Sequence, residues 1–414
     1  MIDSVRNLPT VKTYVEILNI VVNGYKKAGP VDIGPYVLAY GLNNVEGHRL
    51  QLGFKTNADF SRKWVLKAYA AYGTKDTRLK YNAELQRIIS RKPWTTAGIK
   101  RRYDLERIGL LTDEIYDNTL LLTASRFGTM RRPFMSTENT VYAQTDIRKG
   151  LTQRLLFRQM DFNPLYNFTY LKNPEEGDSS PLLNKFSTTE LVLETRITKD
   201  ETFLQNDNER ISLGTYKPIV SLRYVLGLKG IMGADFNYQK FSLTASQYIR
   251  MGVLGRSFYA INAAYIPSRL PYPLLFNHLG NQTYFYNTTS YNLMNYFEFS
   301  SDKYISLNYQ HNFEGLLFNR IPVMRKLKWR LLATANILKG SLRDENLSIY
   351  PLSDNQNSVL PPIQPLGAMP YIEVGYGIEN IFKFIRIDAV HRITYLNNTG
   401  VRKFGIFVTT QFKL

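Results

Sequence analysis

The chain has 414 residues with no cysteine, 29 tyrosines and 23 phenylalanines, and its 52 lysines and arginines exceed its 34 acids by a formal net charge of +18. It contains no unbroken apolar run of about 18 residues, which excludes membrane-spanning helices but not strands whose alternate side chains face lipid. The lack of cysteine excludes a disulfide framework and a thiolate metal site. The cations are spread along the chain without a nucleic-acid-binding motif around them, so nucleic acid is not an expected partner.

Residues 1–30 are predicted to form an amphipathic helix and a lead-in to the rest of the chain. Apolar residues recur there at alternating steps of four and three, the spacing of one helix face. They are Val11, Val15, Leu18, Val22 and Tyr25. We favour a helix packed on its own domain over one that lies on a lipid surface. No basic segment followed by an apolar core is visible, so we expect the chain to be the C-terminal part of a longer secreted protein.

After residue 30 the apolar period changes to two, which is the period of a β-strand. In residues 63–73 an apolar set of side chains alternates with a wetter set that includes two lysines. The apolar set is Trp64, Leu66, Ala68, Ala70 and Tyr72. Aromatic residues stand at both ends of this set, as in a membrane strand whose apolar band is flanked by aromatic girdles. We therefore expect these five side chains to face lipid.

About sixteen segments share this alternation, and many exceed the five or six residues of an average soluble strand. They lie near 32–43, 46–57, 62–74, 77–90, 95–107, 137–149, 151–163, 188–200, 209–228, 233–246, 249–266, 303–314, 327–341, 370–381, 382–396 and 401–414. Membrane strands need about nine to eleven residues. The sequence thus predicts an all-β fold, in which residues 31–414 form a transmembrane antiparallel β-barrel of about 16 strands, preceded by one short N-terminal amphipathic helix.

The connections between these segments differ in length in a way that fits an outer-membrane barrel. Such barrels have short periplasmic turns and long outer loops. If the N-terminal helix lies in the periplasm, the four longest connections fall on the outer side, while the moderately long turn at 314–326 falls on the inner side and is a misfit. The long connections lie near 108–136, 164–187, 267–302 and 342–370.

Residue patterns that would indicate catalysis or a cofactor are missing from the sequence. We find no GxSxG, P-loop or HExxH motif, and the four histidines, at 48, 278, 311 and 391, are widely separated. We therefore expect the protein not to be an enzyme and to hold neither a cofactor nor a metal ion.

The most concentrated charges of a predicted strand pair lie near the C-terminal end. On segments 370–381 and 382–396 a polar set of side chains faces away from the apolar set, and adjacent antiparallel strands would place its acids beside its arginines. This charge ladder consists of Glu373, Glu379, Arg386, Asp388 and Arg392. Two interpretations stay open: structural charge balance in a wet lumen, or an anchor for a loop that folds into the barrel.

Four segments resemble an uncharacterised family of outer-membrane barrels of Gram-negative bacteria. They are VDIGPYVLAYGLNNVEGHRLQLGFKTN, YPLLFNHLGNQTYFYNTTSYNLMNYFEFSSDKYISL, GLLFNRIPVMRKLKWR and PYIEVGYGIENIFKFIRIDAVHRITYL. Longer members of that family carry a carboxypeptidase-regulatory-like domain upstream of the barrel. The resemblance therefore implies that this chain is a C-terminal barrel domain in the outer membrane.

More distantly, the layout is similar to the bacterial surface antigen superfamily of sixteen-stranded barrels that insert or translocate polypeptides. That superfamily has a long loop before its last five strands, with an Arg-Gly-aromatic motif that reaches into the lumen. The matching loop here is 267–302, in which the arginine of the motif is missing. Gly280 and the aromatic residues match the motif loosely. The loop also carries many aromatic residues between Tyr284 and Phe299, which would form an exposed apolar patch if the loop extended outside, so we expect them to be buried. We therefore expect a lumen-inserted loop built around Gly280, Asn281, Tyr284, Phe285 and Tyr286. Docking of these aromatic residues on a partner protein above the membrane is the alternative.

These observations lead to three candidate functions for an integral outer-membrane barrel. The first is outer-membrane biogenesis or the translocation of polypeptides or lipoproteins. The second is a passive or ligand-selective pore, and the third is a non-transporting anchor for a periplasmic domain. The expected partners are outer-membrane lipids, with other outer-membrane or periplasmic assembly proteins as further candidates.

Overall fold

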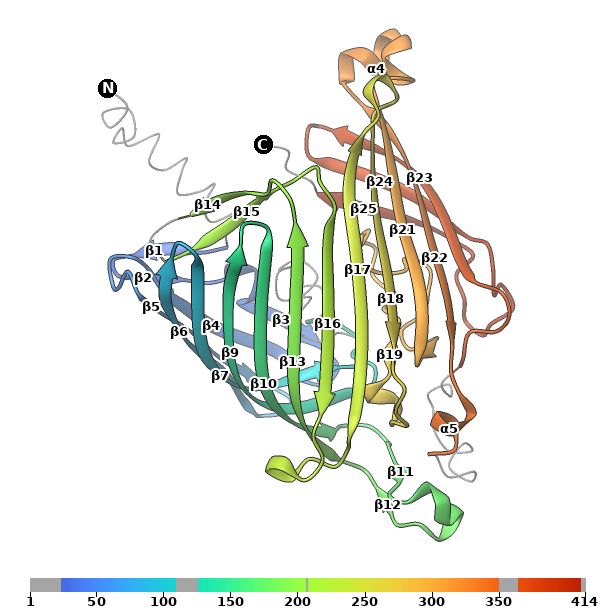
Figure 1. Cartoon of the computed structure of the whole chain (residues 1–414). Helices are drawn as coiled ribbons and strands as arrows, with labels where there is room; N and C mark the ends of the chain where they lie inside the picture. Colours follow the sequence, from blue (N-terminus) through green and yellow to red (C-terminus); the bar gives the residue numbers. More distant parts are fainter. Residues whose placement is uncertain (1–23, 109–125, 206–207, 350–363, 411–414) are drawn as a thin grey trace. The chain divides into compact units, whose positions relative to one another are not determined.

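The computed structural model describes residues 24–108, 126–205, 208–349 and 364–410 (Figure 1). Most of the predicted N-terminal helix lies outside the described residues. Its last predicted residues do not continue a helix, because Lys26–Ala28 form strand β1. Backbone contacts divide the chain into two compact units. Unit 1 comprises Met1–Asp146, Leu155–Tyr166 and Phe203–Ile211, and unit 2 comprises Ile147–Arg154, Asn167–Thr202 and Ser212–Leu414.

Unit 1 is built from strands that pair with their neighbours in chain order. The strands are β1 (Lys26–Ala28), β2 (Val31–Ile33), β3 (Tyr40–Asn43), β4 (Gly47–Thr56), β5 (Trp64–Gly73), β6 (Leu79–Arg91), β7 (Trp94–Arg107), β8 (Phe127–Gly128), β9 (Pro133–Arg148) and β10 (Leu151–Pro164). Antiparallel pairs run from β4 through β5, β6 and β7 to β9, while β8 pairs with β3 in parallel. The predicted strand 32–43 is wrong as one strand, because the 3₁₀ turn η1 (Tyr36–Leu38) separates β2 from β3.

Unit 2 is an antiparallel meander in which each long strand pairs with the next. Its strands are β13 (Phe186–Thr198), β16 (Ile219–Gly227), β17 (Tyr238–Arg250), β18 (Arg256–Tyr265), β21 (Lys303–Glu314), β22 (Arg330–Ser341), β23 (Tyr371–Ile381), β24 (Ile385–Arg392) and β25 (Phe404–Thr410). The predicted strand 209–228 is also wrong as one strand. Its first part is β15 (Arg210–Gly214), which pairs with β14 (Thr202–Gln205) in a separate ribbon.

Short elements occupy the connections between the strands. The connection from β10 to β13 holds β11 (Tyr170–Leu171), η2 (Pro174–Ser179) and β12 (Leu182–Leu183). The remaining short elements are η3 (Ile231–Gly233), η4 (Gly252–Leu254), η5 (Tyr272–Leu274), β19 (Phe276–Asn277), β20 (Ser300–Ser301), η6 (Phe318–Arg320), α4 (Pro322–Leu327) and α5 (Asp344–Leu347). Among the described residues, no helix has the length and apolar character needed to cross a membrane.

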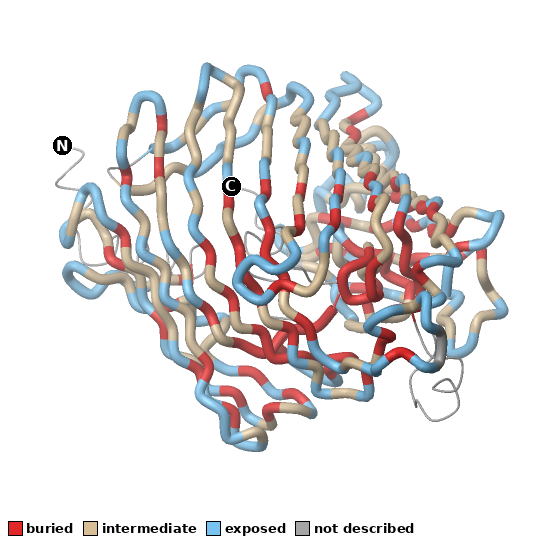
Figure 2. The backbone as a smooth tube through the Cα atoms, turned by 60° about the horizontal axis from the view of Figure 1, so that its bottom comes forward, coloured by how far each residue is buried: buried red, intermediate tan, exposed pale blue. Residues whose placement is uncertain are grey.

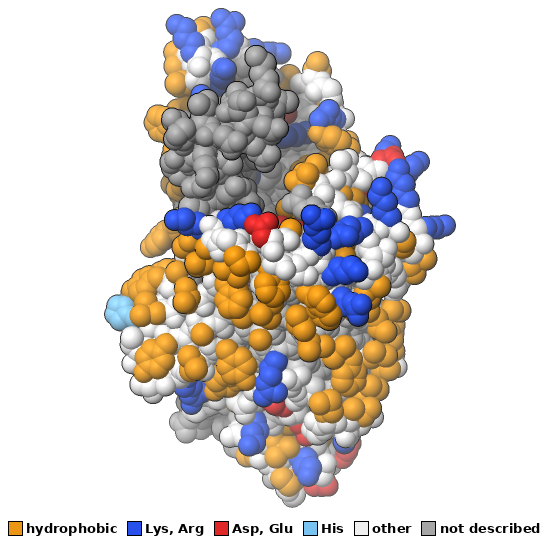
Figure 3. Space-filling model, turned by 90° about the vertical axis from the view of Figure 1, so that its left-hand side faces the viewer, with side chains coloured by type: hydrophobic (Ala, Val, Ile, Leu, Met, Phe, Trp, Pro, Cys, Tyr) orange, Lys and Arg blue, Asp and Glu red, His pale blue; other side chains and the backbone are white. Residues whose placement is uncertain are grey.

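Each unit has one apolar and one polar sheet face, because successive side chains of a strand point to opposite sides. On β5, Trp64 and Tyr72 are exposed whereas Val65 and Ala71 are buried. Large exposed apolar side chains recur in this way on strands of both units, and Figure 3 shows a broad field of them on one face of the molecule. Figure 2 shows the accompanying alternation of buried and exposed residues along the strands. A soluble protein would not expose so much apolar surface.

The structure therefore confirms the all-β prediction, and long antiparallel strands lie where most of the predicted segments do. The closure of these strands into one barrel and the total of about 16 strands stay predictions. So does the division of the chain into an N-terminal helix followed by a single barrel domain.

Candidate functional site

The predicted charge ladder lies on the polar face of unit 2, where β23 and β24 pair. In the register of this pair Glu373 lies opposite Arg392, and Gly377 lies opposite Asp388. All five ladder side chains are buried, with exposed fractions between 0% and 3%. Buried charges are costly unless they are paired and hydrogen-bonded, so the partners of each one decide what the ladder does.

The centre of the ladder is a two-pronged ion pair within β24. Arg386 Nε lies 2.7 Å from Asp388 Oδ2, and Arg386 Nη2 lies 2.7 Å from Asp388 Oδ1. The third nitrogen of the guanidinium, Nη1, donates to Gln310 Oε1 of β21 at 2.7 Å. The guanidinium also lies 4.6 Å from the ring centre of Tyr286, which belongs to the connection between β18 and β21. This pair therefore both balances charge and contacts the predicted inserted loop.

Glu373 holds the same loop by its backbone. Its Oε1 accepts a hydrogen bond from the backbone N–H of Asn292 at 2.8 Å, and its Oε2 accepts one from the N–H of Leu293 at 3.0 Å. The side chains of Asn336 and Tyr371 donate to the same carboxylate, both at 2.9 Å. The carboxylate is thus saturated by four donors, two of which belong to the loop.

Arg392 forms the second anchor of the loop. Its Nη1 lies 2.9 Å from Glu298 Oε2 and its Nη2 lies 2.5 Å from Glu298 Oε1. Nη1 also donates to the backbone carbonyl of Leu293 at 3.3 Å. Glu379 lies at the other end of the ladder and accepts a hydrogen bond from the side chain of Asn312 of β21. The ladder therefore combines strand-to-strand pairing, at Glu379, with two loop anchors, at Glu373 and Arg392.

The connection between β18 and β21, residues 266–302, is defined here as the docked loop. Its side chains complete two apolar clusters on the polar face of the sheet. Tyr291, Met294 and Phe299 pack with Leu338, Leu366 and Tyr371, and Tyr286 and Leu293 pack with Val390 and Phe407. These aromatic and aliphatic side chains are buried on a face whose strand residues are largely polar. The loop therefore covers part of the polar face instead of extending into solvent.

Two glycines make this close approach sterically possible. A Cβ atom at Gly405 of β25 would lie 3.0 Å from Leu293 Cδ2, so the absence of a side chain leaves room for the loop. At Gly280 a Cβ would lie 2.4 Å from the carbonyl oxygen of Met294 within the loop. Gly280 is thus required for the fold of the loop itself, which matches its place in the predicted set.

Three of the predicted loop residues, Gly280, Asn281 and Tyr286, are buried, whereas Tyr284 and Phe285 are 81% and 64% exposed. The expectation that the aromatic residues of this loop are buried is therefore wrong for these two. The reason is a strand-like contact with β25. Phe285 forms a parallel β-bridge with Val408, so its side chain continues the apolar face on which Val408 lies.

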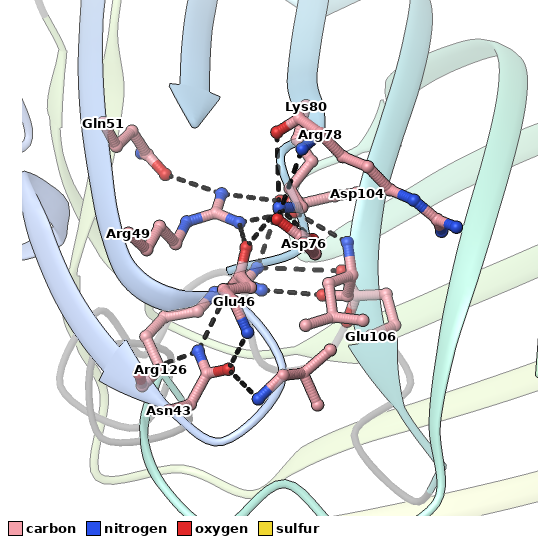
Figure 4. Close-up of polar contacts among 12 residues, drawn as sticks. Asn43, Glu46, Arg49, Gln51, Asp76, Arg78, Lys80, Asp104, Glu106 and Arg126 are labelled. Carbon is pink, nitrogen blue, oxygen red and sulfur yellow. Dashed lines mark hydrogen bonds and ion pairs between the residues drawn. The ribbon is translucent and has the colours of Figure 1, made fainter. Parts of the chain in front are cut away.

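A second group of buried charges lies on the polar face of unit 1, and the sequence reasoning missed it (Figure 4). Arg49 of β4 donates to both carboxylate oxygens of Asp104 of β7, at 2.7 and 3.0 Å, and to Glu46 at 2.7 Å. Lys80 of β6 lies 2.9 Å from the same Glu46. Arg126 lies 3.2 Å from Asp104 and donates to the carbonyl of Leu105. Opposite charges on the polar register of neighbouring predicted strands were the signal that could have revealed this ion network.

Within the described parts of the chain, no three His, Asp or Glu side chains are grouped so that they could hold a metal ion. His278 of the docked loop is buried, and its Nε2 lies 2.9 Å from Ser301 Oγ. Burial lowers the pKa of His278 to about 3, so the ring is neutral at pH 7. The contacts described at this site are ion pairs and hydrogen bonds that hold a loop on a sheet.

Several solved structures are similar to this chain. BamA from Haemophilus ducreyi lacking POTRA domains 1-3 is similar with a TM-score of 0.54 and 10% identity, over 93% of this chain and 71% of that chain. CdiB from Escherichia coli has a TM-score of 0.46 and 10% identity, over 93% of this chain and 63% of that one. OccK11 from Pseudomonas aeruginosa has a TM-score of 0.31 and 8% identity, over 88% and 87%. The BamA similarity shows the fold alone: an all-β chain with the strand arrangement of an outer-membrane barrel.

Comparison by sequence gives the family. No curated protein matches the chain. A family described as "Family of unknown function (DUF5686) C-terminal domain" matches residues 123–345, which is more than half of the 414 residues. The upstream carboxypeptidase-regulatory-like domain that the resemblance implied stays a prediction. The family assignment itself is confirmed, and this chain belongs to the DUF5686 family through its C-terminal domain.

Proposed function

We propose that the chain is an integral β-barrel of the bacterial outer membrane that handles polypeptides, by assembling outer-membrane proteins or by translocating polypeptides or lipoproteins. The exposed apolar faces of both units support the membrane location, since lipid is the solvent in which such faces are stable. The fold similarity to BamA supports the barrel. The resemblance of the sequence layout to barrels that insert or translocate polypeptides supports the polypeptide-handling role. Outer-membrane lipids are the partners that follow from the apolar faces.

The observation that carries the proposal is the docked loop. A passive pore needs a polar lining that solutes can reach, and its lining charges set its selectivity. Here Glu373 and Arg392 are buried under the loop and are saturated by its backbone and by Glu298. Both charges hold the docked loop in place, so in the resting protein the loop covers this part of the polar face. A gated device fits this arrangement better than an open channel does.

The test is to deplete the protein from its native host and to measure the composition of the outer-membrane proteome. The proposal predicts that specific outer-membrane proteins or surface lipoproteins decrease, while the solute permeability of the envelope stays unchanged. Complementation with Glu373→Ala should restore the proteome less well than complementation with Glu314→Ala, because Glu314 is a surface acid of the same unit. An unchanged proteome combined with lost uptake of a solute would instead favour the ligand-selective pore.

A further inference from the structure

The edge of β25 is an unusual place for a loop to bind. β25 pairs with β24 along one edge, and Val408 lies opposite Ile387 in that register. The N–H of Val408 donates to the carbonyl of Tyr284 at 3.0 Å, and its carbonyl accepts from the N–H of Tyr286 at 3.2 Å. In an antiparallel sheet the N–H and the C=O of one strand residue point to the same side, so those of Val408 both point away from β24. The segment 284–286 therefore lies on the edge of β25 that faces away from β24.

This segment follows the two-sided pattern of a strand. Phe285 lies on the apolar side beside Val408 and is exposed, as are Phe404 and Ile406 of β25. Tyr286 lies on the polar side, where it is buried against Phe407. A strand added to a membrane sheet needs this alternation of an apolar and a polar-facing side chain. Residues 284–286 of the loop therefore lie where a further strand beside β25 would lie, and they follow its side-chain pattern.

We propose that residues 284–286 form an internal lock on a strand-accepting edge, which an extended segment of a second polypeptide displaces. The expected partner is a segment with apolar side chains at alternate positions, because it must continue the apolar face at Phe404, Ile406 and Val408. Main-chain hydrogen bonds to a sheet edge supply affinity in this mode of recognition, and alternate side chains supply specificity. The inference rests on the proposed function and names the surface through which the polypeptide is bound.

The lock is held in a way that permits release. Its hydrogen bonds to β25 are the two with the backbone of Val408 and one from Thr409 Oγ1 to the carbonyl of Tyr286 at 3.3 Å, and each such bond contributes modestly in water. The side chains of Tyr284 and Phe285 bury little surface. The segment is positioned by Asn281, whose Nδ2 donates to the carbonyl of Phe285 at 2.7 Å and to Asn292 Oδ1 at 2.9 Å. A longer segment could bond to Phe404 and Ile406 as well, whose backbone groups share the direction of those of Val408.

The test measures binding of a fluorescent peptide to the full chain in detergent. The peptide has the sequence QTYFYNT of residues 282–288, and its controls are a scrambled peptide and one N-methylated at the position of Tyr286. Because the chain has no cysteine, Phe285→Cys with Val408→Cys gives a single disulfide that closes the lock. Asn281→Ala loosens the lock. Peptide binding should be at least about tenfold tighter for Asn281→Ala than for the oxidised double-cysteine protein.

Two results are required together, and each has a counterpart that overturns the inference. Reduction of the disulfide should restore binding in the same protein sample, which separates locking from misfolding. The N-methylated peptide should bind no better than the scrambled one, because it lacks the N–H that donates to Val408. Equal binding by the oxidised and reduced protein, or full binding of the N-methylated peptide, would overturn the proposal.

A second variant tests whether the backbone of Val408 at the edge of β25 binds the peptide. Val408→Pro removes an N–H that points away from β24, so the pairing of β24 with β25 should persist. We expect loss of peptide binding with an unchanged melting temperature. Unchanged binding would refute the claim that the peptide binds to this edge of β25. This inference and the proposed function can fail separately. Peptide binding without any proteome change on depletion would refute only the function, whereas a proteome change without peptide binding would refute only the edge.

Discussion

Glu373 is the residue whose substitution tests the docking of the loop most directly. It is 1% exposed and its carboxylate accepts four hydrogen bonds, two of them from the loop N–H groups of Asn292 and Leu293. Glu373→Ala removes the acceptor and leaves these buried donors without it. Hydrogen bonds to a charged group contribute about 1.5–3 kcal/mol each, so the two loop bonds amount to about 3–6 kcal/mol of docking free energy.

The loss of docking free energy can be measured as faster hydrogen exchange of the loop amides. At about 1.4 kcal/mol per factor of ten, the amides of Asn292 and Leu293 should exchange about 10²–10⁴-fold faster in Glu373→Ala. Glu373→Gln keeps one acceptor oxygen and should lie between wild type and Glu373→Ala. Glu314→Ala is the matched control, since it removes an equal charge from a partly exposed site in the same unit.

The assay is hydrogen–deuterium exchange with mass spectrometry on the purified protein in liposomes. Melting temperatures of the variants would be measured in parallel to separate loop release from unfolding of the strands. If protection of Asn292 and Leu293 were the same in Glu373→Ala and in wild type, the carboxylate would not anchor the loop. The reasoning from its four hydrogen bonds would then be refuted.

Three further predictions concern the membrane face, the ion network and pH. Ala68→Arg should impair folding into liposomes far more than Lys67→Ala, because an arginine at mid-bilayer costs about 2–4 kcal/mol on the lipid face; equal folding yields would contradict the register of β5. Asp104→Asn should destabilise unit 1 by about 3–5 kcal/mol in thermal unfolding, because Arg49 would lose a buried charge partner; an unchanged melting temperature would count against the network. His278 is buried with its pKa lowered to about 3, so the docked loop binds fewer protons than the released loop. Docking should therefore be fully stable above the ordinary histidine pKa of about 6.5 and lose about 2 kcal/mol between pH 7 and pH 5; proteolysis of the loop should accelerate over that range, and His278→Gln should abolish the acceleration.

The alternation of side chains predicted the strands well because it is a local property. From β4 to β7 the predicted segments coincide with strands to within a few residues, and the polar set of residues 370–396 identified the ladder. The breaks at residues 36–38 and 215–218 were missed. Residues 36–38 are a run of apolar residues and residues 215–218 still alternate in polarity, so neither pattern marks a break. In both places the backbone leaves the strand next to a proline, Pro35 in one case and Pro218 in the other.

The details of the site depended on contacts that a single sequence does not reveal. Arg49 and Asp104 are 55 residues apart in the chain, and their pairing is set by the registers of four strands. The exposure of Phe285 follows from its bridge to Val408, 123 residues later. Tyr286 and Phe299 are buried, but the aromatic composition of the loop could not show that residues 284–286 would lie on a sheet edge.

The most direct test of a gated barrel closed by the docked loop is single-channel conductance in a planar bilayer. The comparison is between wild type and a variant that lacks residues 280–291, both purified and checked for folding by melting temperature. The account predicts a small or absent conductance for wild type and a larger, noisier conductance for the deletion, with a lower melting temperature. Identical conductance and stability for the two proteins would contradict it, because the loop would then not close the polar face.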